Sequence, residues 1–357
     1  MNIAIRADAS IEMGSGHIMR CLTLADELIK QGHQAFFICR DLKGNLANLI
    51  REKEIPVYMI KSKDNEECDE HLYYSKWLRG SSIYDVEETL RIIKDGMKRS
   101  IDWLIVDHYA LDKFWEEQIQ QNGIKIMVID DLADREHKCE LLLDQNYYPN
   151  CQIRYKDLVP KHAKCLLGPQ YALLRDEFVN EKRVIRNRKP LKILVFFGGS
   201  DTTNETLKHL NFLGKIHKQI EFLVNVVVGI NNPNKEKIKR IIKKNSNMFY
   251  HEQVNYMARL MCESDLAICA GGSTTWERYY MNLPAILIAV AHNQIEICES
   301  IIDFGIDYYL GKPNEANIKD FEKALFTMFT RLEKVEGAQI VDGYGKNRVI
   351  NCMMREY

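Results

Sequence analysis

Short apolar runs alternate with longer amphipathic stretches along the whole chain, a pattern that predicts β-α-β units built on parallel sheets. In the first helix-length stretch, Ile18, Leu22 and Ala25 recur at steps of four and three residues. We expect this apolar face to pack on a sheet, with polar residues such as Arg20 on the other side of the helix. Gly32 is expected to end the helix in a left-handed conformation.

The apolar runs of strand length fall into two groups separated by a basic segment. The first group comprises residues 2–6, 35–39, 57–60, 103–106, 125–129, 141–143 and 164–167, and the second comprises 192–196, 222–228, 248–250, 266–270 and 285–288. Residues 181–190, EKRVIRNRKP, are poor in large apolar side chains and end in proline, which is typical of a linker. The pattern predicts an α/β fold of two Rossmann-like domains, 1–182 and 191–357, joined at 183–190.

Composition narrows the range of functions. The 357 residues are 46% hydrophobic and 28% charged, which is typical of an ordinary globular protein of two domains. Because the chain has 49 basic and 50 acidic residues, its net charge creates no overall electrostatic field that would attract nucleic acid or an anionic membrane, and we expect neither as a partner. The first residues, MNIAIRADAS, do not resemble a signal peptide, and the longest apolar run, LPAILIAVA, is too short to span a bilayer. Together with ten scattered cysteines that form no C-x-x-C pair, these features predict a cytoplasmic protein.

Three glycine-rich turns each follow a predicted strand and precede a predicted helix, at residues 14–17, 198–201 and 271–274. Glycine lets a ligand approach the backbone, and the N–H groups at a helix start attract phosphate. One such turn is more often structural, but three at strand ends indicate a phosphate-containing ligand. None contains G-x-G-x-x-G or the Walker lysine pattern, so neither a nicotinamide cofactor nor ATP is expected.

His17 is the candidate base, since it lies between a glycine turn and the first helical turn, where the positive end of the helix dipole disfavours an imidazolium. A bound pyrophosphate would act in the opposite direction. Asp8, on the same strand-end loop, either holds the His17 ring, positions a water molecule, or is a solvated carboxylate. His108, His251 and His292 lie at strand ends, where each either lines a cleft or has only a solvated role.

Two further features have more than one interpretation. Glu277 lies in the first turns of a predicted helix, where its carboxylate either accepts hydrogen bonds from ribose hydroxyls or interacts with the helix dipole. Taken alone, its position slightly favours the dipole role. Residues 68–82 form a long excursion between a strand and a helix, a position where α/β domains often place substrate contacts.

Seven motifs in register resemble the UDP-2,4-diacetamido-2,4,6-trideoxy-β-L-altropyranose hydrolases of pseudaminic acid biosynthesis. They are RADASIEMGSGHIMRCLTLADEL at 6–28, DHYALD at 107–112, DDLADR at 130–135, LDQN at 143–146, GPQYALLR at 168–175, FGGSD at 197–201 and AGGSTTWERYYMNLPAILIAVAHNQ at 270–294. That family is similar in turn to the GT-B glycosyltransferases, including the N-acetylglucosaminyl transferase of peptidoglycan synthesis. The resemblance implies two Rossmann-like domains with parallel sheets facing a central cleft, with the nucleotide on the C-terminal domain and the sugar reaching the N-terminal one.

The resemblance also implies roles for individual residues. It makes His17 the essential base and places Tyr109 and Asn293 near the sugar; with Asp8, these are the candidate catalytic residues. It makes Glu277 the ribose carboxylate, and the segment 251–254 would read uracil through backbone groups. The candidate residues for binding UDP and the sugar are Gly14, Gly16, Arg20, Gly198, Gly199, Ser200, Val254, Gly271, Gly272, Ser273, Thr274, Glu277 and Gln294. The portion after about residue 314 is assigned a packing role, with a helix that returns to the first domain as one option.

The resulting hypothesis is hydrolysis of the bond between the anomeric carbon and the UDP oxygen, with inversion, by a water molecule that gives its proton to His17. UDP needs no strong general acid to leave, because a terminal phosphate has a second pKa of about 6. We expect a monomer that requires neither a metal nor a cofactor. Two alternatives are a GT-B glycosyltransferase of surface or spore-coat polysaccharide synthesis and a non-catalytic protein that binds a nucleotide sugar.

Overall fold

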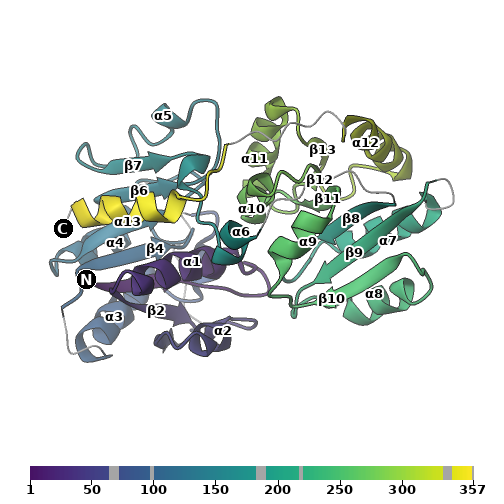
Figure 1. The fold of residues 1–357 in the computed structure, drawn as a ribbon. Helices are drawn as coiled ribbons and strands as arrows, with labels where there is room; N and C mark the ends of the chain where they lie inside the picture. The colour runs from purple at the N-terminus through teal and green to yellow at the C-terminus, as the bar shows by residue number, and fades with distance from the viewer. Residues whose placement is uncertain (64–71, 97–99, 182–189, 217–219, 333–339, 356–357) are drawn as a thin grey trace. The chain divides into compact units, whose positions relative to one another are not determined.

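The computed structural model describes residues 1–63, 72–96, 100–181, 190–216, 220–332 and 340–355 (Figure 1). The chain divides into two compact units, Met1–Leu173 with Tyr344–Tyr357, and Leu174–Gly343. Apart from Pro190, the expected linker at 183–190 lies outside the described residues. Within those ranges, no helix combines the length and the apolar character that crossing a membrane requires.

The first unit is built on a seven-stranded parallel sheet in the order β3-β2-β1-β4-β5-β6-β7. Its strands are β1 (Asn2–Ala7), β2 (Gln34–Arg40), β3 (Val57–Ile60), β4 (Trp103–Asp107), β5 (Lys125–Ile129), β6 (Leu141–Asp144) and β7 (Lys164–Leu167). Each predicted strand of this half is confirmed. The direction of the strand order reverses at β1, which lies between β2 and β4, and open α/β sheets bind ligands at such a reversal.

Helices cover both faces of this sheet. They are α1 (Gly16–Lys30), α2 (Ala47–Glu52), α3 (Ser82–Arg91), α4 (Lys113–Gln120), α5 (Cys151–Arg154) and α13 (Gly345–Arg355), with the short turns η1 (Ser75–Leu78), η2 (Ile92–Gly96) and η3 (Pro169–Tyr171). Side chains of α1 and α13 form one core with the sheet, and side chains of α3 and α4 form another. Helix α1 ends as predicted, since Gly32 has φ +85° and its N–H donates to the Ile29 carbonyl at 2.9 Å.

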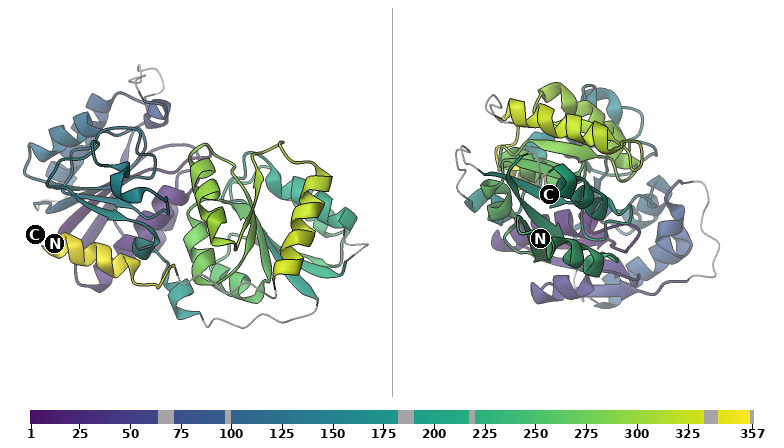
Figure 2. Two further views of the ribbon diagram at one scale, coloured as in Figure 1. Left: turned by 90° about the horizontal axis from the view of Figure 1, so that it is seen from above. Right: turned by 90° about the vertical axis from the view of Figure 1, so that its right-hand side faces the viewer.

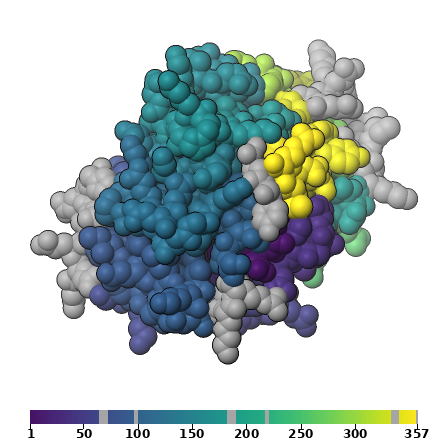
Figure 3. All heavy atoms as spheres, turned by 90° about the vertical axis from the view of Figure 1, so that its left-hand side faces the viewer, coloured from purple at the N-terminus to yellow at the C-terminus, as the bar shows by residue number. Residues whose placement is uncertain are grey.

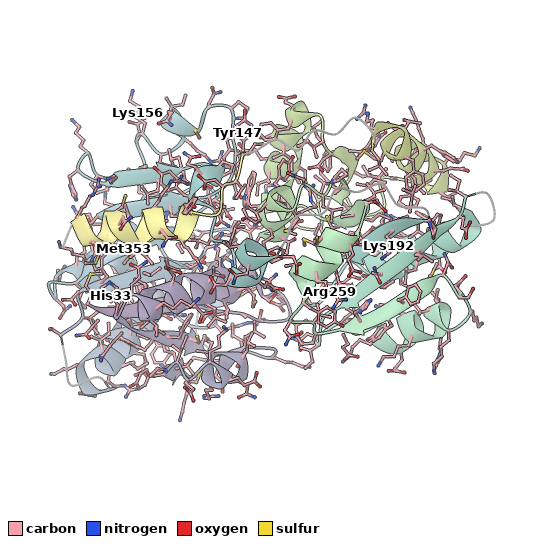
Figure 4. All side chains as sticks on the ribbon, in the orientation of Figure 1. His33, Tyr147, Lys156, Lys192, Arg259 and Met353 are labelled. Atoms are coloured by element: carbon pink, nitrogen blue, oxygen red, sulfur yellow. The ribbon has the colours of Figure 1, made fainter. Side chains whose placement is uncertain are left out.

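The C-terminal helix α13 belongs to the first unit. Its residues Val349, Ile350 and Met353 are fully buried against the sheet and α1, and Figure 3 shows the helix packed against the N-terminal segment. Figure 4 labels Met353 on this helix. A Cβ on Gly345 would lie 2.2 Å from the Ala172 carbonyl oxygen, so only glycine permits this close approach at the start of α13.

The second unit is built on a six-stranded parallel sheet in the order β10-β9-β8-β11-β12-β13, and the left view of Figure 2 shows helices on both of its sides. Its strands are β8 (Leu191–Phe196), β9 (Phe222–Val228), β10 (Met248–Glu252), β11 (Leu266–Ala270), β12 (Ala285–Ile288) and β13 (Tyr308–Gly311). Its helices are α6 (Asp176–Asn180), α7 (Glu205–Ile216), α8 (Lys235–Ile242), α9 (Met257–Glu263), α10 (Thr274–Tyr280), α11 (Asn293–Ile301), α12 (Ile318–Arg331) and the turn η4 (Ile302–Phe304).

Two features of this unit differ from the sequence expectation. The hydropathy pattern does not indicate β13, because this edge strand is short and its side chains are only half-buried. The unit also begins before residue 191, since α6 packs on α9 and the Glu177 carboxylate accepts the Ala258 N–H at 3.1 Å.

A buried ion pair fixes the edge of the second sheet. Arg278 of α10 donates two hydrogen bonds of 2.6 Å to the carboxylate of Asp307, which immediately precedes β13. The same carboxylate accepts the Tyr279 hydroxyl and the Ala285 N–H, each at 2.9 Å. Both members of the pair are at most 2% exposed, so neither charge has water as an alternative partner.

We expect Asp307→Ala to lower the free energy of unfolding by about 3–5 kcal/mol, because it leaves the buried Arg278 cation without its counter-charge. Urea denaturation measures the effect. The matched control is Asp303→Ala, which removes an exposed carboxylate from the same connection. Equal effects of the two substitutions would contradict a structural role for the buried pair.

Candidate active site

The carboxyl ends of β1, β4 and β5 bring the chemistry of the first unit together. β1 leads into a turn in which Gly14 has φ +77° and donates its N–H to the Ser10 carbonyl at 2.9 Å, and α1 begins two residues later. Asp107 is the last residue of β4, and Asp131 follows β5 closely. Because β4 pairs with both β1 and β5, side chains from all three strand ends meet at one edge of the sheet.

His17 is held by Asp107. The His17 Nδ1 lies 2.5 Å from Asp107 Oδ1, and the two side chains are 6% and 0% exposed. An ionised carboxylate only accepts hydrogen bonds, so in the neutral imidazole Nδ1 carries the proton and Nε2 presents a lone pair. A histidine arranged in this way can take a proton at Nε2.

Arg20 keeps Asp107 charged. Its Nε lies 2.6 Å from Asp107 Oδ2, its Nη2 lies 2.7 Å from Asp107 Oδ1, and its Nη1 lies 3.0 Å from Asp131 Oδ2. Burial alone would raise the pKa of Asp107, but Arg20 and His17 outweigh burial and hold this pKa well below its usual range. The expectation that Arg20 lies on the polar side of α1 is therefore wrong, since its guanidinium is buried against two carboxylates.

Tyr109 extends this cluster. Its hydroxyl donates to Asp131 Oδ1 at 2.5 Å, and its ring stands edge-on to the His17 imidazole with the centroids 4.6 Å apart. Burial and the Asp131 charge raise the pKa of Tyr109 well above its usual value, so the phenol stays protonated. The structure thus brings together Tyr109 and His17, two of the candidate catalytic residues.

Asp8 occupies a separate buried network. Its carboxylate pairs with the Arg6 guanidinium at 2.6 Å and accepts the Arg40 backbone N–H at 2.6 Å. The His108 Nε2 lies 3.3 Å from it, and Nε2 carries the proton because His108 Nδ1 accepts the Ala110 N–H. Asp8 is fully buried, so it is not a solvated carboxylate, and the carboxylate that holds the His17 ring is Asp107.

The first glycine turn of the second unit differs from its expected form. Gly198 follows β8 with φ +79°, but α7 begins only at Glu205. The Asp201 carboxylate accepts the N–H groups of Glu205 and Thr206 at 2.8 and 3.0 Å and so caps this helix. An anion at this turn would therefore meet the backbone of residues 198–200 rather than these two capped groups of α7.

The second glycine turn lies against α11. A Cβ on Gly271 would lie 2.1 Å from Cys298 Sγ, and a Cβ on Gly272 would lie 3.5 Å from Gln294 Nε2. Gln294 is fixed in turn, since its Oε1 accepts the Val290 N–H at 3.1 Å. The structure thus places Gly271, Gly272 and Gln294 side by side, with Asn293 next to Gln294 at the start of α11. The turn continues through Ser273 into α10 at Thr274.

Glu277 is paired with a residue that the sequence analysis did not single out for a role. Arg175 donates from Nε and Nη2 to the two carboxylate oxygens of Glu277 at 2.7 and 3.1 Å, and its Nη1 contacts Glu177 at 2.5 Å. The carboxylate is thus oriented by an ion pair, in addition to any interaction with the α10 dipole. Val254, the candidate for reading a base, is half-buried just after β10.

Several site residues could not be recognised from their spacing. Asp107, Asp131 and Arg175 each stand within a motif, but nothing in the sequence says which partner each meets. Among the described residues, no group of three or more His, Cys, Asp or Glu side chains is arranged to hold a metal ion. The cysteines within these ranges are free thiols.

Comparisons with known proteins agree with this architecture. Residues 193–330 match the glycosyltransferase family 28 C-terminal domain. In overall structure the chain is similar to MurG of Acinetobacter baumannii, with a TM-score of 0.66, 16% identity and 99% of both chains covered. It is also similar to the spinosyn rhamnosyltransferase SpnG complexed with thymidine diphosphate, with a TM-score of 0.63, 13% identity, and 99% and 95% of the two chains covered. These likenesses show a GT-B-like fold.

Two relatives in sequence are informative. The chain is 25% identical over 364 residues to the spore coat polysaccharide biosynthesis protein SpsG of Bacillus subtilis, covering 100% of this chain and 99% of that protein. It is 30% identical over 295 residues to the UDP-2,4-diacetamido-2,4,6-trideoxy-β-L-altropyranose hydrolase of Campylobacter jejuni, covering 82% of this chain and 93% of that protein. By this extent of identity, the chain belongs to the family of the UDP-2,4-diacetamido-2,4,6-trideoxy-β-L-altropyranose hydrolases.

Proposed function

We propose that this protein hydrolyses a UDP-linked 2,4-diacetamido-2,4,6-trideoxyhexose, in the β-L-altropyranose form, to UDP and the free sugar. The observation that carries the proposal is the His17–Asp107 pair at the end of the first sheet, which supplies a base where the family places one. Identity to the Campylobacter jejuni hydrolase supports the choice of substrate. We further propose that the protein acts as a cytoplasmic monomer in pseudaminic acid biosynthesis.

The base would act on water. As the water oxygen bonds to the anomeric carbon, one of its protons passes to His17 Nε2, and the bond from that carbon to the UDP oxygen breaks with its electron pair on the phosphate. Attack opposite the leaving group inverts the anomeric carbon. Asp107 stabilises the imidazolium that forms, and Arg20 keeps Asp107 ionised for this purpose.

The second unit would bind the nucleotide. In this proposal the backbone of Gly198–Ser200 and of Gly271–Thr274 holds the diphosphate, and Glu277, oriented by Arg175, accepts the ribose hydroxyls. The backbone near Val254 would meet the uracil, and Asn293 and Gln294 would meet the sugar. Because backbone N–H groups would hold the diphosphate in this proposal, the protein needs no net positive charge, in agreement with its formal net charge of −1.

A glycosyltransferase is the second candidate function, favoured by the match to the glycosyltransferase family 28 C-terminal domain and by the likeness to SpsG. Both enzymes would bind the same donor, but only the hydrolase releases free sugar without an acceptor. A protein that only binds the nucleotide sugar is less consistent with the geometry, since binding does not require a base held by a buried carboxylate.

The purified protein, incubated with the UDP-trideoxy sugar alone, is expected to release UDP and free sugar in equal amounts, with the inverted anomer seen first by NMR. His17→Ala should lower turnover by at least about 100-fold and leave UDP binding intact, because general-base catalysis contributes about 10²- to 10⁴-fold. The control is His33→Ala, which removes an imidazole from beyond the other end of α1 (Figure 4). Sugar release only on addition of a carbohydrate acceptor would support the transferase instead.

The pH dependence of activity tests whether Asp107 stays charged. Because the folded pKa of Asp107 lies well below its usual range, this carboxylate stays charged across an assay from about pH 5 to about pH 9, and its contribution to stability is lost only at lower pH. Asp107 should therefore contribute no ionisation to the acid limb of kcat/KM, and the slope of this limb should not exceed one. Asp107→Asn should reduce kcat about 10²- to 10⁴-fold across the range, whereas a slope of two would contradict a permanently charged Asp107.

Glu277 should discriminate between UDP and its 2′,3′-dideoxy analogue. Hydrogen bonds to a charged group contribute about 1.5–3 kcal/mol, so the unaltered protein should bind UDP at least roughly tenfold more tightly than the analogue. Glu277→Gln should remove most of this difference when both dissociation constants are measured by calorimetry. Glu236→Gln, on the exposed side of α8, is the control and should preserve it. Equal binding of the two ligands by the unaltered protein would disprove the ribose contact.

A further inference from the structure

Three aromatic side chains form a continuous surface beside His17. The Trp77 and Tyr109 rings are stacked with an interplanar angle of 28° and centroids 5.9 Å apart. The Tyr74 centroid lies 4.4 Å from that of Trp77 and 5.1 Å from that of Tyr109. We call Tyr74, Trp77 and Tyr109 the aromatic wall.

Two rings of the aromatic wall lie beside the imidazole. Tyr109 is edge-on to His17 at 4.6 Å, and Trp77 is also edge-on, with centroids 6.4 Å apart. Tyr109 is almost fully buried, whereas Tyr74 and Trp77 are only half-buried and keep part of their ring surface available. A ligand whose reacting carbon lies near His17 would therefore lie close to these two rings.

The turn that carries Tyr74 and Trp77 is anchored to the sheet. Its residue Leu78 is buried in the core shared by β2 and β4, and the Arg79 carbonyl accepts the Lys63 N–H at 2.9 Å. The Arg79 guanidinium also contacts the Glu12 carboxylate at 3.3 Å, within the loop that leads to Gly14. The described part of the excursion, residues 72–82, is therefore held beside the loop that precedes His17, whereas residues 68–71 lie outside the described ranges.

The chemistry of the aromatic wall suits apolar groups. Burial raises the pKa of Tyr74 to about 12, and the Tyr109 hydroxyl donates to Asp131, so the wall carries no charge at neutral pH. Aromatic faces attract C–H groups and offer no hydrogen bond to replace those that a hydroxyl makes with water. Binding sites of this composition use a few polar groups for orientation and the rings for affinity.

We propose that the aromatic wall binds the apolar substituents of the sugar, namely the C6 methyl group and the methyl groups of the acetamido side chains. The wall then makes the protein prefer 6-deoxy, diacetamido sugars to hydroxylated ones. This inference rests on the proposed function, because it takes the sugar to lie beside His17. A single methyl group in an apolar site changes affinity by roughly 10- to 200-fold, which is enough to select a substrate.

The fluorescence of Trp77 can report ligand binding at the aromatic wall. The chain has four tryptophans, and Trp103, Trp115 and Trp276 are at most 1% exposed. Trp77 alone of the four is half-buried, so a ligand that contacts the wall should change the emission of this residue. Titration of fluorescence therefore measures binding at the wall independently of turnover.

The experiment compares three ligands in the His17→Ala background, where turnover does not consume them: UDP, the UDP-diacetamido-trideoxy sugar and UDP-N-acetylglucosamine. Calorimetry gives the dissociation constants for Trp77→Leu and for Trp77→Phe, which keeps an aromatic ring. We expect Trp77→Leu to weaken binding of the trideoxy ligand roughly tenfold or more, to change UDP binding less than about twofold, and to reduce the preference over UDP-N-acetylglucosamine. Trp77→Phe should restore most of the affinity.

The matched control is Phe114→Leu, which removes a half-exposed ring from α4 of the same unit and should leave all three affinities unchanged. Equal weakening of both sugar nucleotides, or unchanged binding of the trideoxy ligand, would overturn the proposal. Thermal unfolding checks that each variant is folded. If Trp77→Leu is not, the fluorescence of Trp77 decides the outcome, because its emission should respond to the trideoxy ligand and not to UDP.

The two proposals can fail separately. If the unaltered protein releases no free sugar but Trp77→Leu selectively weakens binding of the trideoxy ligand, the hydrolase proposal is wrong and the proposal for the aromatic wall is supported. If free sugar is released and Trp77→Leu does not alter the preference for the trideoxy ligand over UDP-N-acetylglucosamine, the hydrolase proposal is supported and the proposal for the aromatic wall is wrong.

Discussion

A charge buried at the end of an apolar strand must be balanced by neighbouring groups, and in the first unit this constraint applies to Asp107. Its carboxylate is fully buried, so Arg20 must lie against it, and Arg20 in turn requires a second acceptor, which Asp131 provides. Tyr109 donates to the same Asp131. Removing the Asp107 carboxylate would therefore leave Arg20 and His17 without the partner that they share.

A second buried network supports the first from the other face of the sheet. Asp85 of α3 accepts hydrogen bonds from Arg6 of β1 at 2.8 Å and from Arg40 of β2 at 2.5 Å. Asp8 completes this network, which explains why Asp8, although it lies on the same strand-end loop as the glycine turn, is not the carboxylate that holds the base. Buried ion pairs contribute little net stability when well-packed apolar residues are the alternative, but breaking one is costly, so they fix a helix at a defined place on its sheet.

The two sheets share the same order over six strands, but different groups gather where that order reverses. In the first unit, charged side chains gather where β1 lies between β2 and β4. In the second unit, the strand order reverses at β8, and there the backbone at Gly229 approaches the backbone at Gly199 closely. A Cβ on Gly229 would lie 2.1 Å from the Gly199 carbonyl oxygen. Side chains suit proton transfer because their pKa values respond to burial and charge, whereas exposed backbone suits the recognition of a diphosphate.

The sequence alone determines what depends on local pattern: the apolar runs of all strands except the edge strand β13, the glycine turns after β1, β8 and β11, and the position of His17 at a helix start. It does not determine which strands are neighbours, so the meeting of Asp107 with His17 and the pairing of Arg175 with Glu277 are decided only by the fold. The same holds for the burial of Arg20 and for the return of α13 to the first unit. The periodicity of apolar residues indicates which side of a helix or strand is buried. A buried charge, however, needs an oppositely charged partner that is often distant in sequence, and only the tertiary structure shows which residue that partner is.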